Sequence, residues 1–332
     1  MEKEKNKKKI LLSGIKPSGV LHIGNYFGAV QQWVKMQEDY ESYVFIANYH
    51  AITSVQDAER LRYQTLEVAL DYLAVGLNPD KVNFFVQSDV LEVAELTWIF
   101  NCITTMPYLM RAHAYKDAVA KNEEVNVGLF DYPILMAADI LIQDTNVVPV
   151  GADQKQHVEY ARDTAEKFNH IFKKEIFTLP QPIILSETGV IKGVDGRKMS
   201  KSYNNIIPLF GSDEIIKKAV MSISTDSKVV DEPKDPKKCN VFALHKLFAG
   251  ENLPKIIEKY KKGGMGYKES KEILIENMIS FIKPMRDKRE DLAKNPDYVL
   301  EVLRKGGTVA RERAIKKMKI IQECVGIIKT LN

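Results

Sequence analysis

The first 205 residues alternate short apolar runs with helical patterns, and this rhythm constrains the fold more than any other feature of the chain. Between two of the runs, Leu61–Val75 places leucines and alanines at helical spacing. Strands separated by helices form a parallel sheet with right-handed crossovers. We therefore expect a Rossmann-like, doubly wound α/β domain over residues 10–205. Its predicted strands are Ile10–Leu12, Tyr43–Ala47, Val82–Val86, Val147–Val150 and Pro182–Leu185.

Other segments depart from this rhythm. A mostly helical insertion is expected within about residues 101–180, most clearly at 101–128, and a disordered basic tail at 1–9. After residue 205, Lys-rich amphipathic patterns predict an all-helical C-terminal domain, 206–332, with a flexible break at Lys261–Tyr267. Its last helix has an apolar stripe of Ala314, Met318, Ile321 and Val325, with cations available for the other faces at Arg311, Arg313, Lys316, Lys317 and Lys319.

The net charge of +4 is unevenly distributed. Residues 1–9 carry +3, residues 10–205 carry −7 and residues 206–332 carry +8. A basic last third beside an acidic larger part indicates contact with a polyanion such as a nucleic acid. Solvated Lys-rich helix faces explain the same charge equally well.

Cysteines and apolar segments bear on the cellular location. Cys102, Cys239 and Cys324 stand far apart and suggest neither a disulfide framework nor a metal site. The chain has no apolar run long enough for a membrane helix and no apolar signal-peptide core after its charged start. We therefore expect a cytoplasmic protein that makes no membrane contact.

A glycine-punctuated turn follows the first predicted strand, from Gly14 to Asn25, and leads into a helical pattern. In a doubly wound sheet, the first strand-to-helix turn lies at the usual ligand crevice. Gly24 would permit close approach of a nucleotide, and His22 and Asn25 would supply donors to phosphate. By itself, this segment is explained more simply as a tight turn with a capping Asn.

A second polar loop, Asp195–Ser202, is rich in cations and hydroxyl groups. Lys198 and Lys201 are three residues apart and suit a pyrophosphate leaving group, on which negative charge grows in the transition state. Taken alone, the loop is more simply a solvated basic turn.

The two segments together resemble the signatures of the class I aminoacyl-tRNA synthetases, H-I-G-H after the first strand and K-M-S-K-S after the last. The chain reads H-I-G-N at His22–Asn25 and K-M-S-K-S at Lys198–Ser202. It is similar to the tryptophan branch of that class over nearly its whole length, and H-I-G-N is the usual form there. The other matching stretches are Ser13–Gly19, His50–Thr53, Leu135–Leu141 and Val148–His157.

The residues also allow an amino-acid pocket to be proposed without the resemblance. Asp131 is a good N-cap and Pro133 suits a first helical turn. Tyr132, Met136 and Asp139 then share one face of the helix. The indole N–H is only a donor, so a carboxylate acceptor favours tryptophan, and Met136 can pack on its ring. Asp139 could equally be a structural cap or an ion-pair partner.

The resemblance implies roles for individual residues. Asp139 would bind the indole N–H, Tyr132 and Gln154 the substrate ammonium, and His50, Met136, Val148 and Val150 would line the pocket. Catalysis is expected from His22, Asn25, Lys198 and Lys201. The chain departs from many relatives at Lys16, Leu12, Ala152 and Tyr203, where they have Gln, Phe, Glu and Asp. Implied ATP contacts are Lys16, Pro17, Ser18, Gly24, Asn25, Gly151, Ala152, Asp153, Val190, Lys198, Met199, Ser200, Lys201 and Ser202.

The reaction that the resemblance implies has two steps. L-tryptophan and ATP give tryptophanyl-AMP and pyrophosphate, and tryptophan then passes to the terminal adenosine 2′-OH of tRNA(Trp). Mg²⁺ would be held mainly by the phosphates, with no protein metal site and no tightly bound cofactor. The resemblance also implies a homodimer with the helical insertion at the interface, and a C-terminal domain that binds the tRNA anticodon.

Three alternatives stay open at this point. A tyrosyl-tRNA synthetase shares the fold and both signatures, but its pocket must bind a phenol. A small HxGH nucleotidyltransferase would lack the basic helical third and would not need tRNA. A non-catalytic tRNA-binding paralogue is disfavoured by the intact lysines at 198 and 201.

Overall fold

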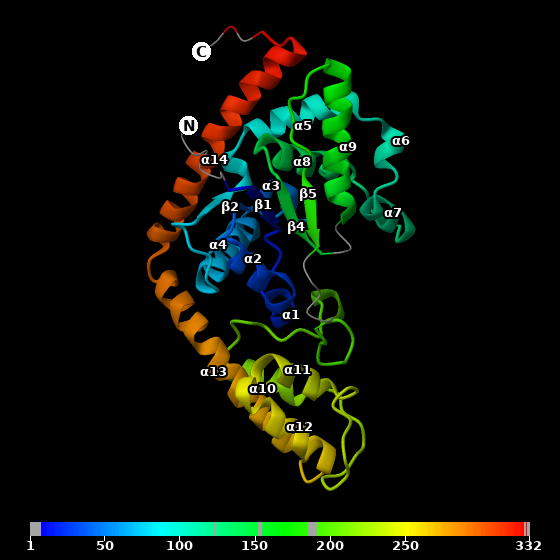
Figure 1. Cartoon of the computed structure of the whole chain (residues 1–332), viewed down its shortest axis with the longest axis vertical. Coiled ribbons are helices and arrows are strands. Elements are labelled where there is room, and N and C mark those ends of the chain that lie inside the picture. The colour runs from blue at the N-terminus through cyan, green and yellow to red at the C-terminus, as the bar shows by residue number, and fades with distance from the viewer. Residues whose placement is uncertain (1–7, 123, 152–154, 185–190, 329, 331–332) are drawn as a thin grey trace, which may run out of the picture. The chain divides into compact units, whose positions relative to one another are not determined.

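The computed structural model describes residues 8–122, 124–151, 155–184, 191–328 and 330, which form two compact units (Figure 1). The first unit comprises Met1–Gly19, Trp33–Leu185 and Asn295–Asn332. The second comprises Val20–Gln32 and Ser186–Lys294. This division differs from the single boundary expected near residue 205, because the last helix belongs to the unit that contains the sheet. Most of the expected disordered tail, residues 1–7, lies outside the described residues.

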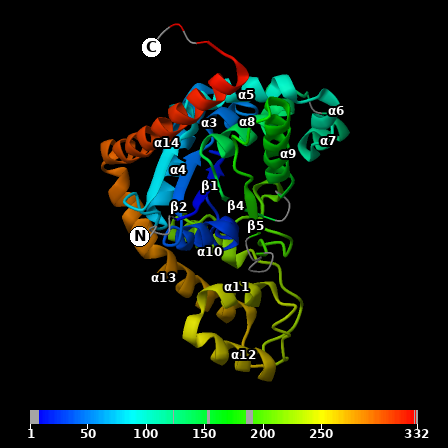
Figure 2. The ribbon, with the colours of Figure 1, turned by 45° about the horizontal axis from the view of Figure 1, so that its top comes forward.

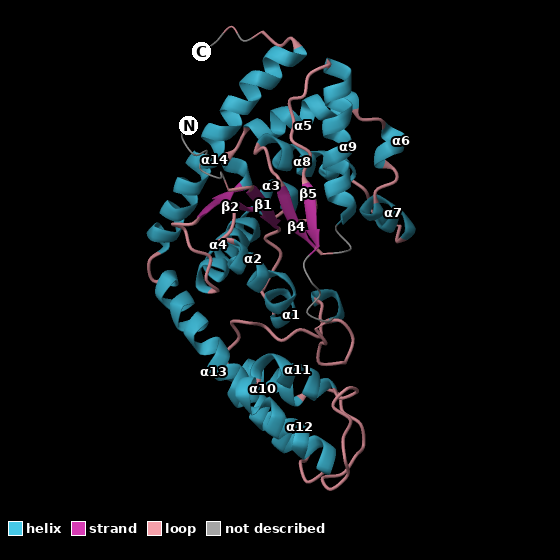
Figure 3. Cartoon of the chain, viewed as in Figure 1, coloured by secondary structure: helices cyan, strands magenta, loops and turns pink. Residues whose placement is uncertain are grey.

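A parallel sheet of five strands forms the centre of the first unit (Figure 3, magenta). Its order is β3-β2-β1-β4-β5, which confirms the predicted doubly wound fold. The order reverses at β1, so the carboxyl ends of β1 and β4 flank the point where ligands bind in such sheets. The strands are β1 (Ile10–Ile15), β2 (Glu41–Ile46), β3 (Val82–Val86), β4 (Val147–Val150) and β5 (Gln181–Ile184).

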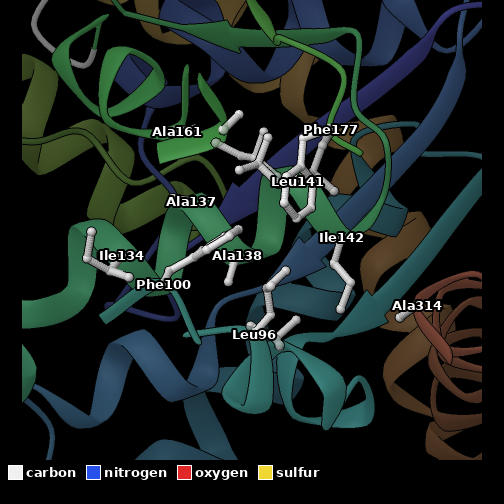
Figure 4. Packing of buried hydrophobic residues seen from close by; sticks show 14 of the residues in the cluster. Leu96, Phe100, Ile134, Ala137, Ala138, Leu141, Ile142, Ala161, Phe177 and Ala314 are labelled. Atoms are coloured by element: carbon white, nitrogen blue, oxygen red, sulfur yellow. The ribbon is translucent and has the colours of Figure 1, made fainter. Parts of the chain in front are cut away.

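Helices cover this sheet and bury a large apolar core (Figure 4). The close-up labels Leu96 and Phe100 of one helix, Ile134 and Leu141 of another, and Phe177, all of which belong to this core. The predicted insertion is helical between residues 101 and 120. The helices are α2 (Gln31–Met36), α3 (Asn48–Ile52), α4 (Ala58–Ala74), η2 (Gln87–Asp89), α5 (Glu92–Ile103), α6 (Met106–Leu109), α7 (His113–Ala120), α8 (Val127–Ile142), α9 (Lys155–Phe172) and α14 (Pro296–Val325).

The long helix α14 packs directly on β3, and two adjacent glycines permit the close approach. A Cβ built on Gly306 would lie 2.1 Å from the carbonyl oxygen of Phe84, and one on Gly307 would lie 2.8 Å from Asp89 Oδ2. The predicted apolar stripe is confirmed, since Ala314, Met318 and Ile321 are buried.

Three of the cations expected on the other faces of α14 contact acidic or carbonyl groups of the first unit. Lys317 is buried and donates to the carbonyl oxygen of Ile176 at 2.6 Å and to Asp144. Arg313 donates to the carbonyl oxygen of Gln143 at 2.8 Å. Arg311 pairs with Glu92, with 3.3 Å between Nε and Oε1.

The second unit is helical, and Figure 2 shows α11 and α12 in yellow-green and yellow. It begins with α1 (Ile23–Asn25) and a π-helical turn, η1 (Tyr26–Val30), whose rings Tyr26 and Phe27 pack against Phe281. Gly263 and Gly264 both have positive φ between α12 and α13, which confirms the predicted break. The remaining elements are η4 (Lys201–Tyr203), α10 (Asp213–Met221), α11 (Asn240–Phe248), η5 (Gly250–Asn252), α12 (Leu253–Lys262) and α13 (Tyr267–Ala293).

Among the described residues, no helix combines the length and the apolar character that crossing a membrane requires.

The close packing of α14 on β3 makes Gly306 sensitive to substitution. We expect Gly306→Ala to lower the free energy of unfolding by about 2 kcal/mol or more, because β3 backbone must move to admit the methyl group. Urea unfolding followed by circular dichroism measures the change. Gly128→Ala in α8 is the matched control, because its new methyl group would meet only side-chain atoms at 3.4 Å or more. Equal stability of the two variants would contradict the packing argument.

Candidate active site

A cavity of about 720 Å³ opens in the first unit where the sheet order reverses. The carboxyl ends of β1 and β4 line it, as does one face of α8. Tyr132, Met136 and Asp139 all lie in its wall, which confirms that they share one face. Other predicted residues in the wall are Leu12, Lys16, His50, Val148, Val150 and Gly151.

The predicted start of α8 is wrong, although the face of the helix is right. The helix begins at Val127, and Asn126 is its N-cap, accepting from the backbone N–H of Leu129 at 2.8 Å. Pro133 therefore lies inside the helix. Asp131 does not cap it and instead accepts from Asn101 Nδ2 at 2.8 Å. Asn and Asp are equally good caps, so the choice between them was not decided by residue type.

Asp139 is the most unusual group in the cavity wall. It is only 6% exposed, and no ion pair among the described residues includes it. Burial raises the pKa of its carboxyl well above the usual range, and a hydrogen bond from Gln87 acts in the opposite direction. Gln87 Nε2 lies 2.7 Å from Asp139 Oδ2. A buried carboxylate at a cavity is a preferred acceptor for a ligand donor.

Sequence reasoning missed Gln87, and only its position could have indicated it. Gln87 is the first residue after β3, at the sheet edge where ligand-binding side chains gather. It is 1% exposed and lines the cavity.

Two histidines flank Tyr132 in the cavity. The rings of His50 and Tyr132 meet edge to face with 4.7 Å between centroids. Tyr132 Oη lies 3.4 Å from Nε2 of His157, a residue that was not predicted to act in the site. Burial, with smaller contributions from Lys16 and His157, lowers the pKa of His50 to about 4. His50 is therefore neutral near pH 7.

In the second unit, His22 and Asn25 cap each other. His22 Nδ1 accepts from the backbone N–H of Asn25 at 3.2 Å, and Asn25 Oδ1 accepts from the backbone N–H of His22 at 3.4 Å. Burial, and then the charge of Lys201, lower the pKa of His22 to about 4. With Nδ1 accepting, the neutral ring carries its proton on Nε2 and can donate from there.

The loop with the two lysines is organised as a hairpin in the same unit. The backbone N–H of Met199 donates to the carbonyl oxygen of Ile191 at 2.8 Å. Met199 is buried, and its sulfur lies 3.3 Å from the backbone nitrogen of Gly24. The two signature segments are therefore in contact, while Lys198 and Lys201 are exposed.

The buried side-chain amide of Asn205 holds this loop by hydrogen bonds. Asn205 Oδ1 accepts from the backbone N–H of Ser200 at 2.8 Å, and Asn205 Nδ2 donates to Asp195 at 2.7 Å. The guanidinium of Arg197 lies over the ring of Tyr203, with its central carbon 4.5 Å from the ring centroid. The ring therefore helps to hold the turn of the loop.

The other residues that were predicted to bind the substrates differ in their exposure, and some lie outside the described residues. Pro17 is buried and Ser18 is exposed in the turn after β1, and burial lowers the pKa of Lys16. The hydroxyl groups of Ser200 and Ser202 lie 2.8 Å apart. Ala152, Asp153, Gln154 and Val190 lie outside the described residues. Within the described part of the chain, no three His, Cys, Asp or Glu side chains are grouped to hold a metal ion.

The family model described as tRNA synthetases class I (W and Y) matches residues 3–283. The chain belongs to this family of class I tRNA synthetases. The expected class and fold are thereby confirmed.

The individual relatives identify the branch of the family to which the chain belongs. The tryptophan–tRNA ligase of Fusobacterium nucleatum is 49% identical over 320 residues, which cover 96% of this chain and 98% of that protein. The tryptophanyl-tRNA synthetase of Campylobacter jejuni, solved with ADP and tryptophan, is 48% identical with a TM-score of 0.91, covering 96% and 99%. That of Mycoplasma pneumoniae is 29% identical with a TM-score of 0.79, covering 96% and 98%. Within the family, the chain is one of the tryptophan–tRNA ligases.

Two histidines with lowered pKa values, the buried His22 and the half-buried His50, predict that acid destabilises the protein. Their pKa is about 4 in the fold for both His22 and His50, against about 6.5 when unfolded. The unfolded chain therefore binds more protons below pH 6.5, and stability is lost as the pH falls from there toward about 4. Urea unfolding between pH 7.5 and 4.5 measures this loss, which we expect to be smaller in His50→Gln. An identical pH dependence in that variant would show that His50 is not buried in its neutral form.

Proposed function

We propose that the cavity of the first unit holds the side chain of L-tryptophan, with Asp139 accepting the indole N–H. The observation that carries this proposal is the carboxylate of Asp139, which is only 6% exposed and lies in the cavity wall beside apolar side chains. Met136, Val148 and Val150 supply apolar surface for the ring. A phenol could also donate to Asp139, but the relatives with high identity are tryptophan enzymes.

The activation step joins the tryptophan carboxylate to the α-phosphate of ATP and releases pyrophosphate. No side chain is needed as a nucleophile, because the substrate carboxylate attacks. Lys198 and Lys201 would stabilise the growing negative charge, and His22 would donate from Nε2 to phosphate. The exposure of both lysines and the neutral state of His22 support these roles.

Mg²⁺ would be held by phosphate oxygens and water rather than by a protein cage. The ion would neutralise phosphate charge.

The second step transfers tryptophan to the terminal 2′-OH of tRNA(Trp), and we assign tRNA binding mainly to the helices of the second unit. Residues 206–294 carry a net charge of +4. The exposed side chains of Lys255 and Lys261 lie on α12, and binding to phosphates would weaken as salt rises.

We also assign the protein to a homodimer. Large apolar side chains are exposed on the helical insertion and its neighbours, and such side chains indicate a surface that another protein chain covers. These are Trp98, Met106, Met110, Val119 and Val127, of which Trp98 is 70% exposed. A cytoplasmic location suits a tRNA substrate and three cysteines that form no disulfide.

Exchange of radioactive pyrophosphate into ATP tests the proposed substrate. We expect exchange that depends on tryptophan, with tyrosine at least about 100-fold weaker in kcat/KM, because a pocket built for one donor geometry rejects another. Charging of total tRNA with each amino acid is the second measurement. Exchange with tyrosine alone would overturn the assignment.

The loop lysines give a separate prediction. We expect Lys201→Ala to lower the rate of adenylate formation at least about 100-fold while tryptophan binding changes little, because the charge acts as pyrophosphate leaves. Single-turnover kinetics and equilibrium binding separate the two effects. Lys217→Ala, an exposed lysine on α10, is the matched control. Equal losses in rate and binding would mean that Lys201 does not act in the transition state.

A further inference from the structure

Gln87 joins the tryptophan cavity to α3, because its side chain contacts both Asp139 and the backbone of His50. We propose that Gln87 is a positioning residue that fixes the Asp139 carboxylate as a hydrogen-bond acceptor and so sets the preference for an indole N–H. The inference rests on the proposed function, because it takes Asp139 as the indole acceptor. Gln87 is 1% exposed, so water does not compete for its amide.

The orientation of the Gln87 amide is determined by its two partners. The backbone N–H of His50 can only donate, and it lies 3.2 Å from Gln87 Oε1. The amide nitrogen must then face Asp139, where Nε2 lies 2.7 Å from Oδ2. A flipped amide would place two donors together at one end and two acceptors together at the other.

The backbone around Gln87 is held as well. Asn48 Nδ2 donates to Ser88 Oγ at 2.8 Å, and Asn48 Oδ1 accepts from the backbone N–H of Ser88 at 3.1 Å. These two hydrogen bonds hold α3 against the residue that follows Gln87. The amide therefore acts as a fixed donor rather than a mobile side chain.

A fixed donor at Oδ2 controls what Asp139 offers the ligand. It favours the ionised carboxylate, in which Oδ1 can only accept. Without it, burial favours a protonated carboxyl, which can turn its O–H toward the cavity. An O–H directed at the indole N–H would repel it. Loss of the Gln87 donor should therefore weaken the binding of ligands that carry the indole N–H, and should leave unchanged the binding of ligands of the same shape that lack it.

Two amino acids of nearly equal shape provide the test, L-tryptophan and its benzothiophene analogue, in which sulfur replaces the N–H. For Gln87→Met, we expect the Kd of tryptophan to rise about 10-fold or more and that of the sulfur analogue to change less than about 3-fold. Equilibrium binding to the purified full-length chain gives both values. Gln87→Leu also removes the donor without adding a charge, so it replaces the Met variant if that one does not fold.

The matched control is Asn101→Leu, because Asn101 also donates an amide N–H to a carboxylate, at 2.8 Å from Asp131, and neither residue lines the cavity. It should change neither Kd. Equal losses of both ligands in the folded Gln87 variants, or no loss of either, would overturn the inference and leave Gln87 a packing residue.

Asp139→Asn separates this inference from the proposed function. If Asp139→Asn removes the preference for tryptophan over the sulfur analogue and the Gln87 variants do not, only the role of Gln87 is refuted. If Asp139→Asn leaves the preference intact, the assignment of Asp139 as the indole acceptor fails with it.

Discussion

Moving a carboxylate from water into an apolar interior costs several kcal/mol unless it gains hydrogen bonds or an opposite charge. Asp139 is 6% exposed among the apolar side chains that join α8 to the sheet, and its described partner is the neutral amide of Gln87. An arginine there would satisfy the carboxylate and close it to a ligand. A neutral donor leaves acceptor capacity for a substrate N–H. The ability of this cavity wall to accept a hydrogen bond from a ligand therefore depends on the partner of Asp139 being neutral.

The signature residues of the second unit have structural contacts besides their chemical roles. His22 and Asn25 cap each other, so His→Ala or Asn→Ala would loosen the turn as well as remove a donor. Met199 is the one apolar residue of its motif, and it is buried against Gly24. This contact explains why a charged loop contains a methionine. It also lets Lys198 and Lys201 stay exposed on a supported hairpin.

The parts of the fold that follow from local pattern could be predicted. All five strands stand in the sequence as short apolar runs, and the face of Tyr132, Met136 and Asp139 follows the 3.6-residue period of a helix, so both are displayed directly. The start of α8 could not be decided, because Asn126 and Asp131 are both good caps and tertiary contacts chose between them. Gln87 and His157 act through partners more than 20 residues away, and one sequence contains no record of such pairs. The membership of α14 in the first unit depends in the same way on Gly306 meeting Phe84.

The contacts of α14 also change what the basic last third of the chain means. Its excess of +8 is shared equally between residues 206–294 and 295–332. On α14, however, Lys317, Arg313 and Arg311 bind acidic or carbonyl groups of the first unit, and such cations add little attraction for a polyanion. The charge that remains for tRNA on this helix is therefore smaller than its composition suggests. A nucleic-acid surface on the basic last third is consequently expected on α12 and α13 more than on the last helix.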